Sequence, residues 1–463
     1  MRPKLNPQAC LDFQPSNLEL TNAYYQRFEA VSRILDENSE ILDLVHQDLK
    51  EALKSATTKD RSGNNFTYTS DTVLRILLCH IIEGRSLRET VVRIDDSQFL
   101  RRFVRIHDGP MMDFTTFCRL KNCIRPETWE KVNAALAGYA VQKSLIEGEQ
   151  LRLDTTAVET NIHWPTDSSL LWDTYRVLGR LIEEARELDP AAVGTRRLQT
   201  RKAKRLFTRI SRKASKNPET MEVLKPLYEE LIRLTTNICQ WAEEVRQQLE
   251  QRCPDILGQA LAAQLAHFRQ LGLRVIDQTS RRVLDEEQVP NEQKIFSIFE
   301  PHTELLKRGK AAKPVEFGHM VQIQQVASKF ITDYDVFEKK PVEHQLVQPA
   351  LDSHKALFGQ YPETFAADKG YYADMATIKE LSRSIKTVSI GKKGSRTEEE
   401  SLRESDPDFR FAQRFRAGVE GTISFLKRVL GLFRCFNKGW PHYVSTIGAG
   451  IFTHNLLLLA RLG

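Results

Sequence analysis

The spacing of apolar residues changes along this chain, and these changes constrain its fold more than any other feature. Up to Gln142 the apolar residues recur at helical spacing. At Gln150 they begin to alternate with polar residues, which is typical of a strand, and from about Leu170 to Leu284 the helical spacing returns. Strand-like segments follow after Pro290. These changes predict a multidomain fold in which helical regions accompany a mixed sheet.

Length and composition agree with a globular chain of two or three domains. Hydrophobic residues make up 41% and charged residues 28% of its 463 residues, which excludes a largely disordered or collagen-like chain. Residues 1–20 lack a basic-then-apolar signal pattern. The apolar stretch Tyr443–Leu459 contains Thr453, His454 and Asn455, which favours a buried helix over a membrane span. We therefore expect a cytoplasmic protein that does not cross a membrane.

Four segments are predicted from these patterns. Residues 1–145 form a helical N-terminal region for DNA binding and dimerisation, and residues 146–169 begin a sheet-containing core. Residues 170–290 are a helical, basic insertion, and residues 291–463 complete the core and add C-terminal helices. Short helices separated by turns, as in the first segment, are typical of helix-turn-helix domains, although an ordinary helical bundle fits the pattern equally well.

Local patterns predict individual elements after the insertion. Alternation predicts strands, glycine and serine clusters predict turns or loops, and helical spacing predicts helices. The predicted strands are 294–299, 317–326, 330–337, 364–368 and 387–391, the predicted helices 351–359, 374–382, 411–430 and 443–459, the predicted turns Gly309–Lys310 and Ser328–Lys329, and the predicted mobile loop 394–408.

Positive charge is concentrated in two places. Residues 196–216 contain ten Lys and Arg and no acid, whereas a solvated helix face usually mixes both signs, so contact with nucleic acid is favoured over a solvated surface. In the N-terminal region, residues 115–125 carry a second, weaker group of candidate phosphate contacts. The candidates are Arg201, Lys202, Lys204 and Arg205 in the first group and Arg119, Lys121 and Arg125 in the second.

The predicted helix 411–430 carries a pattern of polar residues whose side chains could form a functional site. At 100° per residue, Gln413, Arg416, Glu420 and Lys427 fall on one narrow stripe. A row of surface salt bridges at helical spacing is the common explanation of such a stripe. Spacing alone therefore does not establish a site.

The order of these residues resembles a known signature. Gln413-x-x-Arg416-x-x-x-Glu420-x-x-x-x-x-x-Lys427 is similar to the Tyr-Arg-Glu-Lys signature of bacterial insertion-sequence transposases of the DDE class, with Gln in place of the Tyr. Leu151–Thr156 resembles the first catalytic strand of that family, and Phe365–Tyr371 resembles the second. The resemblance covers most of the chain, and it is loose over residues 170–290.

This resemblance implies a ribonuclease-H-like core, in which two strands and one helix of a mixed five-stranded sheet domain bring three carboxylates together. Position by position these are Asp154, Asp368 and Glu420. They would be catalytic residues and ligands of two Mg²⁺ ions, with Mn²⁺ able to substitute, because Mg²⁺ prefers hard oxygen ligands. The implied reaction cleaves the element ends and joins the released 3′-hydroxyl groups to target DNA.

The resemblance also implies the partners. The substrate would be double-stranded DNA, both element ends and target, held by a homodimer in the synaptic complex of a nucleoid-associated bacterial enzyme. DNA contacts would come from Gln413, Arg416, Lys427 and Lys369. Trp164 or Trp172 would be available to hold a flipped base, although an ordinary packed Trp is the more common role.

Two other hypotheses about the function stay open at this point. One is a DNA-binding relative without catalysis, and another is a ribonuclease-H-like recombination nuclease. Asp333 and Asp335, on a predicted strand, compete with Asp368 for the second carboxylate, but no Lys-Gly follows them and their spacing fits a solvent face. Asp154→Ala separates an active transposase from a DNA-binding relative without catalysis, because in a transposase cleavage should vanish while DNA binding persists.

Overall fold

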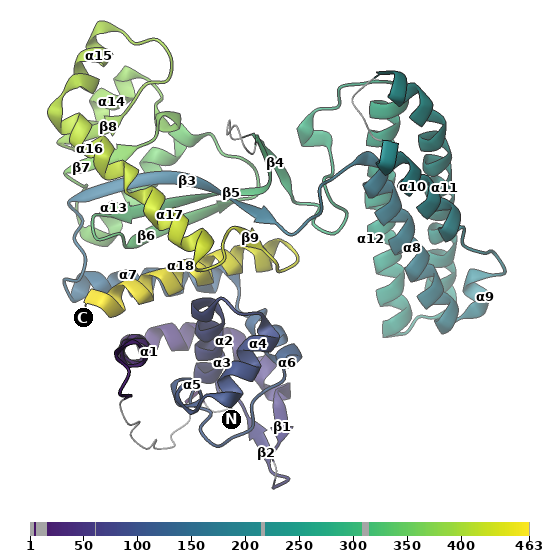
Figure 1. Cartoon of the computed structure of the whole chain (residues 1–463), viewed down its shortest axis with the longest axis horizontal. Helices are drawn as coiled ribbons and strands as arrows, with labels where there is room; N and C mark the ends of the chain where they lie inside the picture. Colours follow the sequence, from purple (N-terminus) through teal and green to yellow (C-terminus); the bar gives the residue numbers. More distant parts are fainter. Residues whose placement is uncertain (1–3, 6–15, 61, 214–217, 308–313, 463) are drawn as a thin grey trace. The chain divides into compact units, whose positions relative to one another are not determined.

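The computed structural model describes residues 4–5, 16–60, 62–213, 218–307 and 314–462. The chain forms two compact units, drawn in Figure 1. The first comprises residues 1–159 and 319–463, and the second comprises residues 160–318. The second unit contains the predicted insertion 170–290 and extends beyond it in sequence, from residue 160 to residue 318.

The first unit begins with short helices, as predicted. Ser86 starts α4 with a capping box in which Glu89 is the reciprocal partner, and Gly84 ends α3 in the left-handed conformation. A small hairpin, β1–β2, was not expected from the sequence. The elements are α1 (Glu19–Glu37), α2 (Ser39–Ser55), β1 (Thr57–Lys59), β2 (Asn65–Thr67), α3 (Ser70–Glu83), α4 (Leu87–Asp96), α5 (Gln98–Phe103), α6 (Phe114–Lys121) and α7 (Pro126–Gln142).

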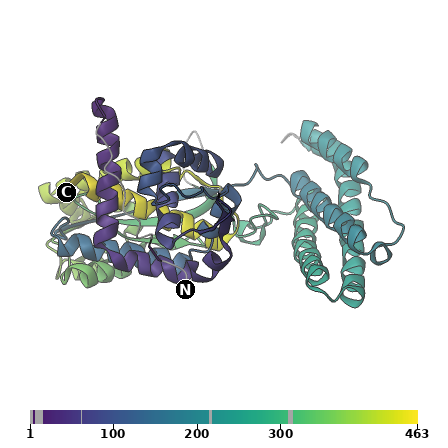
Figure 2. The same cartoon turned by 90° about the horizontal axis from the view of Figure 1, so that it is seen from below.

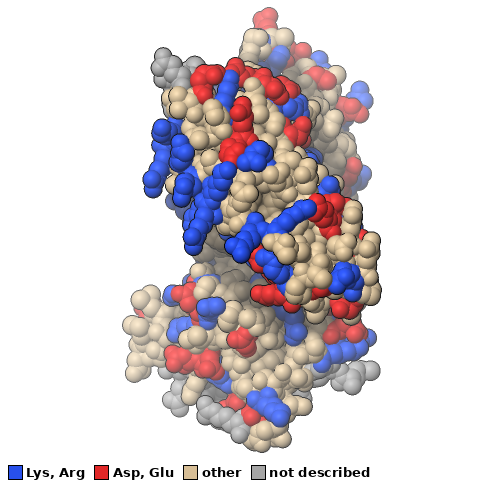
Figure 3. Space-filling model, turned by 90° about the vertical axis from the view of Figure 1, so that its right-hand side faces the viewer, with Lys and Arg blue, Asp and Glu red and all other residues tan. Residues whose placement is uncertain are grey.

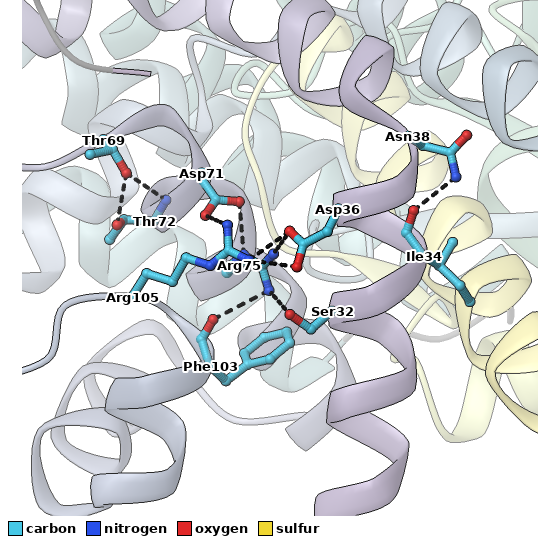
Figure 4. Close-up of polar contacts among 10 residues, drawn as sticks. All are labelled: Ser32, Ile34, Asp36, Asn38, Thr69, Asp71, Thr72, Arg75, Phe103 and Arg105. Carbon is cyan, nitrogen blue, oxygen red and sulfur yellow. Dashed lines mark hydrogen bonds and ion pairs between the residues drawn. The ribbon is translucent and has the colours of Figure 1, made fainter. Parts of the chain in front are cut away.

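A partly buried ionic network connects these N-terminal helices (Figure 4). Arg75 of α3 is fully buried and forms ion pairs of 2.8 Å with both Asp71 and Asp36. Arg105, which follows α5, reaches the same two carboxylates at 2.9 and 2.6 Å. Because each acid is shared by two guanidinium groups, the network joins α1, α3 and the end of α5.

The sheet is mixed, which confirms the predicted combination of helices with an α/β region. Its strand order is β4-β5-β3-β7-β8, β6 pairs with β5, and β9 pairs with β3. Strands β3, β7 and β8 run parallel, whereas β4 and β6 are antiparallel to β5. The strands are β3 (Gln150–Thr160), β4 (Glu304–Lys307), β5 (Val315–Val326), β6 (Ile331–Phe337), β7 (Thr364–Ala367), β8 (Thr387–Ile390) and β9 (Arg434–Cys435).

Two hydrophobic cores flank the sheet of the first unit. Leu151, Leu153 and Phe365 contribute to the smaller core, together with α13 and α14. The larger core joins the N-terminal helices to β5, β6 and α18, so the N-terminal helices share their core with the C-terminal helix. The helices after β6 are α13 (Val347–Phe358), α14 (Met375–Leu381), α15 (Glu398–Ser405), α16 (Pro407–Ala417), α17 (Val419–Arg428) and α18 (Trp440–Leu462).

Helix α18 is long and apolar enough to cross a membrane by length and composition alone. However, 78% of its most apolar window is buried inside the fold, which identifies it as a core helix. Its Asn455 accepts a hydrogen bond from Ile331 N and donates one to Ile331 O, at 3.0 and 2.8 Å. The polar side chain of Asn455 therefore forms hydrogen bonds inside the fold, as expected for the buried helix that the sequence predicts.

The second unit is helical. The long helices α8, α11 and α12 lie side by side, and α10 packs against α8 and α11 (Figures 1 and 2). Leucine, isoleucine and valine fill its core, for example Leu178, Leu231 and Leu265. The helices are α8 (Asp167–Leu188), α9 (Pro190–Val193), α10 (Thr200–Lys213), α11 (Pro218–Arg252) and α12 (Ile256–Thr279), followed by a π-turn at Ser280–Leu284 and a 3₁₀ turn at Asn291–Gln293.

Two local predictions away from the candidate site are wrong, one completely and one in part. Residues 294–299 form no strand, because Ile295 N bonds to the Gln278 side chain and Ser297 Oγ accepts from the amides that follow it. Of the predicted loop 394–408, residues 398–405 instead form helix α15, which starts with a capping box of Thr397 and Glu400. The turn predicted at Gly309–Lys310 lies outside the described residues.

Candidate functional site

Register places the two predicted catalytic aspartates on neighbouring strands. In the parallel pair β3–β7, Leu151 is opposite Phe365 and Arg152 is opposite Ala366. Extending this register by two residues sets Asp154 opposite Asp368, the residue that follows β7. Neighbouring strands lie about 4.8 Å apart and opposite residues share a face, so both carboxylates emerge together at one edge of the parallel strands.

Both aspartates are held locally. Asp154 is largely buried, accepts from Thr155 N at 2.8 Å and forms an ion pair of 3.2 Å with Arg416 Nη1. Asp368 is exposed and accepts from Lys369 N at 2.6 Å, where it caps the 3₁₀ turn Lys369–Tyr371. Asp154 is therefore held near a guanidinium, whereas Asp368 is open to solvent.

The helix that carries the signature is broken in two. The predicted single helix 411–430 is wrong, because α16 ends at Ala417 and α17 begins at Val419. The carbonyl of Phe415 accepts from Gly418 N at 3.1 Å and from Arg152 Nη1 at 2.6 Å. In an uninterrupted helix the Phe415 carbonyl would accept a hydrogen bond from the amide of Val419. Here it accepts one from the side chain of Arg152 on strand β3 instead.

Gly418 allows this arrangement. A Cβ at that position would lie 2.5 Å from Arg152 Nη1. Arg152 is only 3% exposed and also donates to Gln325 Oε1, and its burial lowers the pKa of Arg152 to about 10. The guanidinium is still charged at neutral pH. Arg152 was not identified from the sequence as a functional residue, and it positions the junction between Arg416 and Glu420.

Helix α17 crosses β3 (Figure 1). Arg416 reaches Asp154, and Lys427 Nζ donates to Ala157 O at 2.6 Å. Glu420 lies between these two residues in sequence, in the first turn of α17, and its side chain is exposed. The segment from Arg416 to Lys427 therefore lies along β3, the strand that carries Asp154, and Glu420 stands at the start of α17.

Two predicted DNA contacts are engaged inside the protein. Gln413 donates to Ser389 O at 2.7 Å and to Ser389 Oγ at 3.0 Å, which attaches α16 to β8. The Lys427 ammonium is bonded to the Ala157 carbonyl of β3. Lys369 lies beside Asp368, and the stem of its side chain is within 3.5 Å of a Cβ built at Gly391.

The three carboxylates suit a hard divalent cation by donor type, because Mg²⁺ prefers carboxylate oxygens. Over the described ranges, no three His, Cys, Asp or Glu side chains are grouped closely enough to hold a metal ion. One oxygen of Asp154 is taken by Arg416. By donor type the three carboxylates fit Mg²⁺ or Mn²⁺, but their side chains would have to move closer together to hold an ion. Arg416 is the neighbouring counter-charge.

A further acid, missed by the sequence analysis, lies beside the aspartates. Glu343, in the 3₁₀ turn Glu343–Leu346, accepts from Thr155 Oγ1 at 3.0 Å. A Cβ at Gly370 would overlap the other oxygen of this carboxylate. No sequence pattern connects Glu343 with Asp154 and Asp368, since only the folded chain brings these segments together.

The basic face of α10 is exposed. Ala203, Leu206 and Ile210 form its buried side, and Arg201, Lys204 and Arg205 point to solvent without an ion pair in the described part of the chain. Lys202 and Arg196, in contrast, pair with Glu230 and Glu244. Figure 3 shows lysine and arginine side chains gathered on one face of the molecule. Lys216 lies outside the described residues.

The N-terminal candidates differ from one another. Arg119 is exposed at the end of α6. Lys121 is buried and donates to Asn122 and Asn437, so it is not available to a phosphate. Arg125 pairs with Asp48 at 2.7 Å. Of the three cations predicted there, Arg119 is the one that stays a candidate.

The two tryptophans also differ. Trp172 stacks against Tyr175 and Phe207, with interplanar angles of 9°, and is an ordinary packed residue. Trp164 is 67% exposed and meets Phe317 edge-on. Trp164 is therefore the tryptophan whose ring is accessible to a base.

Comparisons of the chain with models of protein families, with curated proteins and with solved structures find no match.

Proposed function

We propose that this protein is a metal-dependent DNA transposase of the DDE class, which cleaves the ends of an insertion sequence and joins them to target DNA. The observation that supports this most strongly is the register that sets Asp154 opposite Asp368. Helix α17, with Glu420 in its first turn, crosses the same strand. Two strands and one helix thus supply three carboxylates, the arrangement that the sequence resemblance implies.

The sheet agrees with a ribonuclease-H-like core. Five strands of the seven-stranded mixed sheet follow the path β6-β5-β3-β7-β8, with β3, β7 and β8 parallel, and β4 and β9 are additional. The proposed catalytic aspartates come from its central strand and from the end of the adjacent parallel strand. Ligands of α/β sheets bind at the carboxyl ends of parallel strands. Asp368 follows the end of β7, and Asp154 lies two residues beyond the part of β3 that pairs with β7.

The residues have distinct roles in the proposed reaction. Asp154, Asp368 and Glu420 would hold two divalent ions, which when bound supply activation of the attacking oxygen and stabilisation of the leaving oxygen. Arg416 balances the charge of Asp154 and would bind a phosphate of the cleaved strand. Lys427 is bonded to β3 in the free protein, so it would contribute positive potential at the site rather than a free ammonium.

DNA binding would use the exposed cations. Arg201, Lys204 and Arg205 on α10 are suited to backbone phosphates, and Arg119 would add a contact from the N-terminal helices. Two DNA ends must be processed together in such a reaction, so we propose a homodimer in the synaptic complex. Trp164 is available to stack on an unpaired base.

Cleavage of a plasmid that carries the element's own ends tests this function. Wild-type protein should yield 3′-hydroxyl products only with Mg²⁺ or Mn²⁺, and Asp154→Ala should yield none while still shifting the same DNA in a gel. A wild type that binds these ends and does not cut would favour the second candidate, a DNA-binding relative without catalysis. Cleavage without joining to target DNA would favour a recombination nuclease.

A further inference from the structure

Glu343 touches both segments that carry the proposed catalytic aspartates. Its Oε1 accepts from the hydroxyl of Thr155, the residue after Asp154. Its Oε2 occupies the space that a Cβ at Gly370, two residues after Asp368, would fill. The glycine at 370 is therefore what leaves room for this carboxylate in its present position.

Tyr371 supplies an independent observation at the same place. Its side chain is 2% exposed, and its hydroxyl has no hydrogen-bond partner in the part of the chain that the structure describes. Burial raises the pKa of Tyr371, and the carboxylates of Asp154, Glu343, Asp368 and Asp335 raise it further. The phenol therefore lies within the electrostatic field of these four acids.

A buried hydroxyl without a partner costs about 1 to 3 kcal/mol. The acids around Tyr371 also repel one another, and Arg416 pairs with Asp154 at 3.2 Å. A cation with its bound water or phosphate oxygens would correct both deficits. It would neutralise the carboxylates and offer an oxygen to the Tyr371 hydroxyl.

We propose that Glu343 is a fourth carboxylate ligand of the divalent-cation site formed by Asp154 and Asp368, and that Tyr371 donates a hydrogen bond to an oxygen bound there. This inference rests on the proposed function, because it assumes that the two aspartates hold a cation. It adds a ligand that the resemblance does not imply, from a 3₁₀ turn between β6 and α13.

A structural role for Glu343 makes a different prediction from a ligand role. If Glu343 only accepts the Thr155 hydrogen bond, Glu343→Gln retains this role, because the amide oxygen also accepts a hydrogen bond and the side chain has the same shape. If Glu343 binds a cation, the loss of its charge weakens the site. Glu363→Gln, an exposed acid just before β7, is the matched control for the loss of one charge.

Mn²⁺ titration of the full chain without DNA, followed by electron paramagnetic resonance, tests the inference. Wild type and Glu363→Gln should bind alike, Asp154→Asn should lose binding, and Glu343→Gln should raise the Kd by about tenfold or more. Tyr371→Phe should raise it by a smaller factor. Melting curves recorded on the same samples establish that each variant is folded.

Failure of the proposed function and failure of the inference about Glu343 give different results in this experiment. Absence of Mn²⁺ binding by wild type would contradict the metal chemistry of the proposed function. Loss of binding in Asp154→Asn with wild-type affinity in Glu343→Gln would overturn the inference alone. Should Glu343→Gln not fold, Gly370→Ala displaces the carboxylate without removing a charge, and wild-type Mn²⁺ affinity in that variant would also overturn it.

Discussion

Residues 1–159 and 319–463 bury two arginines, Arg75 and Arg152, whereas residues 160–318 bury none within their described part. In the first unit each buried guanidinium joins elements that are distant in sequence, as when Arg152 of β3 bonds to Gln325 and to Phe415. In the second unit many ion pairs join residues three or four apart on one helix, such as Arg246 with Glu243.

This difference separates two uses of charge. A buried, hydrogen-bonded charge is costly to move, so it fixes the relative positions of strands and helices around Asp154. An exposed charge contributes little to stability and remains available to a polyanion. We therefore expect changes in the first unit to affect cleavage and folding, and changes on α10 to affect DNA binding.

The largest expected effect concerns the remaining carboxylates. Asp368→Asn and Glu420→Gln should each lower the cleavage rate by about a thousandfold or more, because metal ions supply several kcal/mol of transition-state stabilisation. Both side chains are exposed, so melting temperatures should change little. Asp333→Asn, the competing acid on β6, is the control and should cleave within about threefold of wild type. Cleavage lost in Asp333→Asn but retained in Asp368→Asn would reverse the assignment.

The second effect is a dependence of stability on pH in the first unit. Burial lowers the pKa of His354 from 6.5 to about 4, and its Nε2 lies 2.9 Å from Gly148 O. The folded state therefore takes up a proton less readily than the unfolded state. The contribution of neutral His354 to the free energy of unfolding is complete above pH 6.5 and is lost as the pH falls towards 4.

At pH 5 the loss amounts to about 2 kcal/mol. Unfolding of wild type and His354→Gln at pH 7 and pH 5 measures it, since the variant lacks the titrating group and should lose less stability. Equal losses in the two proteins would show that His354 titrates normally.

The third effect belongs to the second unit. Replacing Arg201, Lys204 and Arg205 with Ala should weaken DNA binding about tenfold at 0.15 M salt and reduce the salt slope by about 3. The control is a triple Ala variant of the cations that already have carboxylate partners, Lys202, Arg233 and Arg246. Because both variants lose three positive charges, equal slopes would make the α10 face a solvated surface rather than a DNA contact.

The smallest effect compares two glycines of the broken helix. Gly421→Ala meets no atom within 4 Å and should stabilise the protein by about 0.5 to 1 kcal/mol. Gly418→Ala places its Cβ against the Arg152 guanidinium and should destabilise it by about 1 to 3 kcal/mol. Chemical unfolding of the two variants measures the contrast. Stabilisation by both would show that Arg152 does not require the glycine.

Local patterns predicted much of the fold. The strands at Gln150–Thr160, Val315–Val326 and Ile331–Phe337 show the alternation or the β-prone composition that defines them, and the helices show their apolar spacing. The error at 294–299 has a clear cause. Its apolar residues are buried, as in a strand, but their backbone groups bond to the side chains of Gln278 and Ser297.

The site was predictable in part. Asp154 and Asp368 were identified by resemblance, and their adjacency depends on a strand register that the sequence does not specify. The helix break was not predictable, because Gly418 has ordinary helical φ and ψ values of −63° and −17° and the cause lies at Arg152, on another strand. Glu343 has no local signal at all, since folding alone brings it to Thr155.

Anomalous diffraction from a crystal of the full chain soaked in Mn²⁺ tests the central claim most directly. We predict a peak at about 2.1 Å from oxygens of Asp154 and Asp368, with Glu420 turned towards the same position. A Mn²⁺ ion held instead by Asp333 and Asp335, or no peak beside Asp154 in crystals that bind Mn²⁺ elsewhere, would contradict the account.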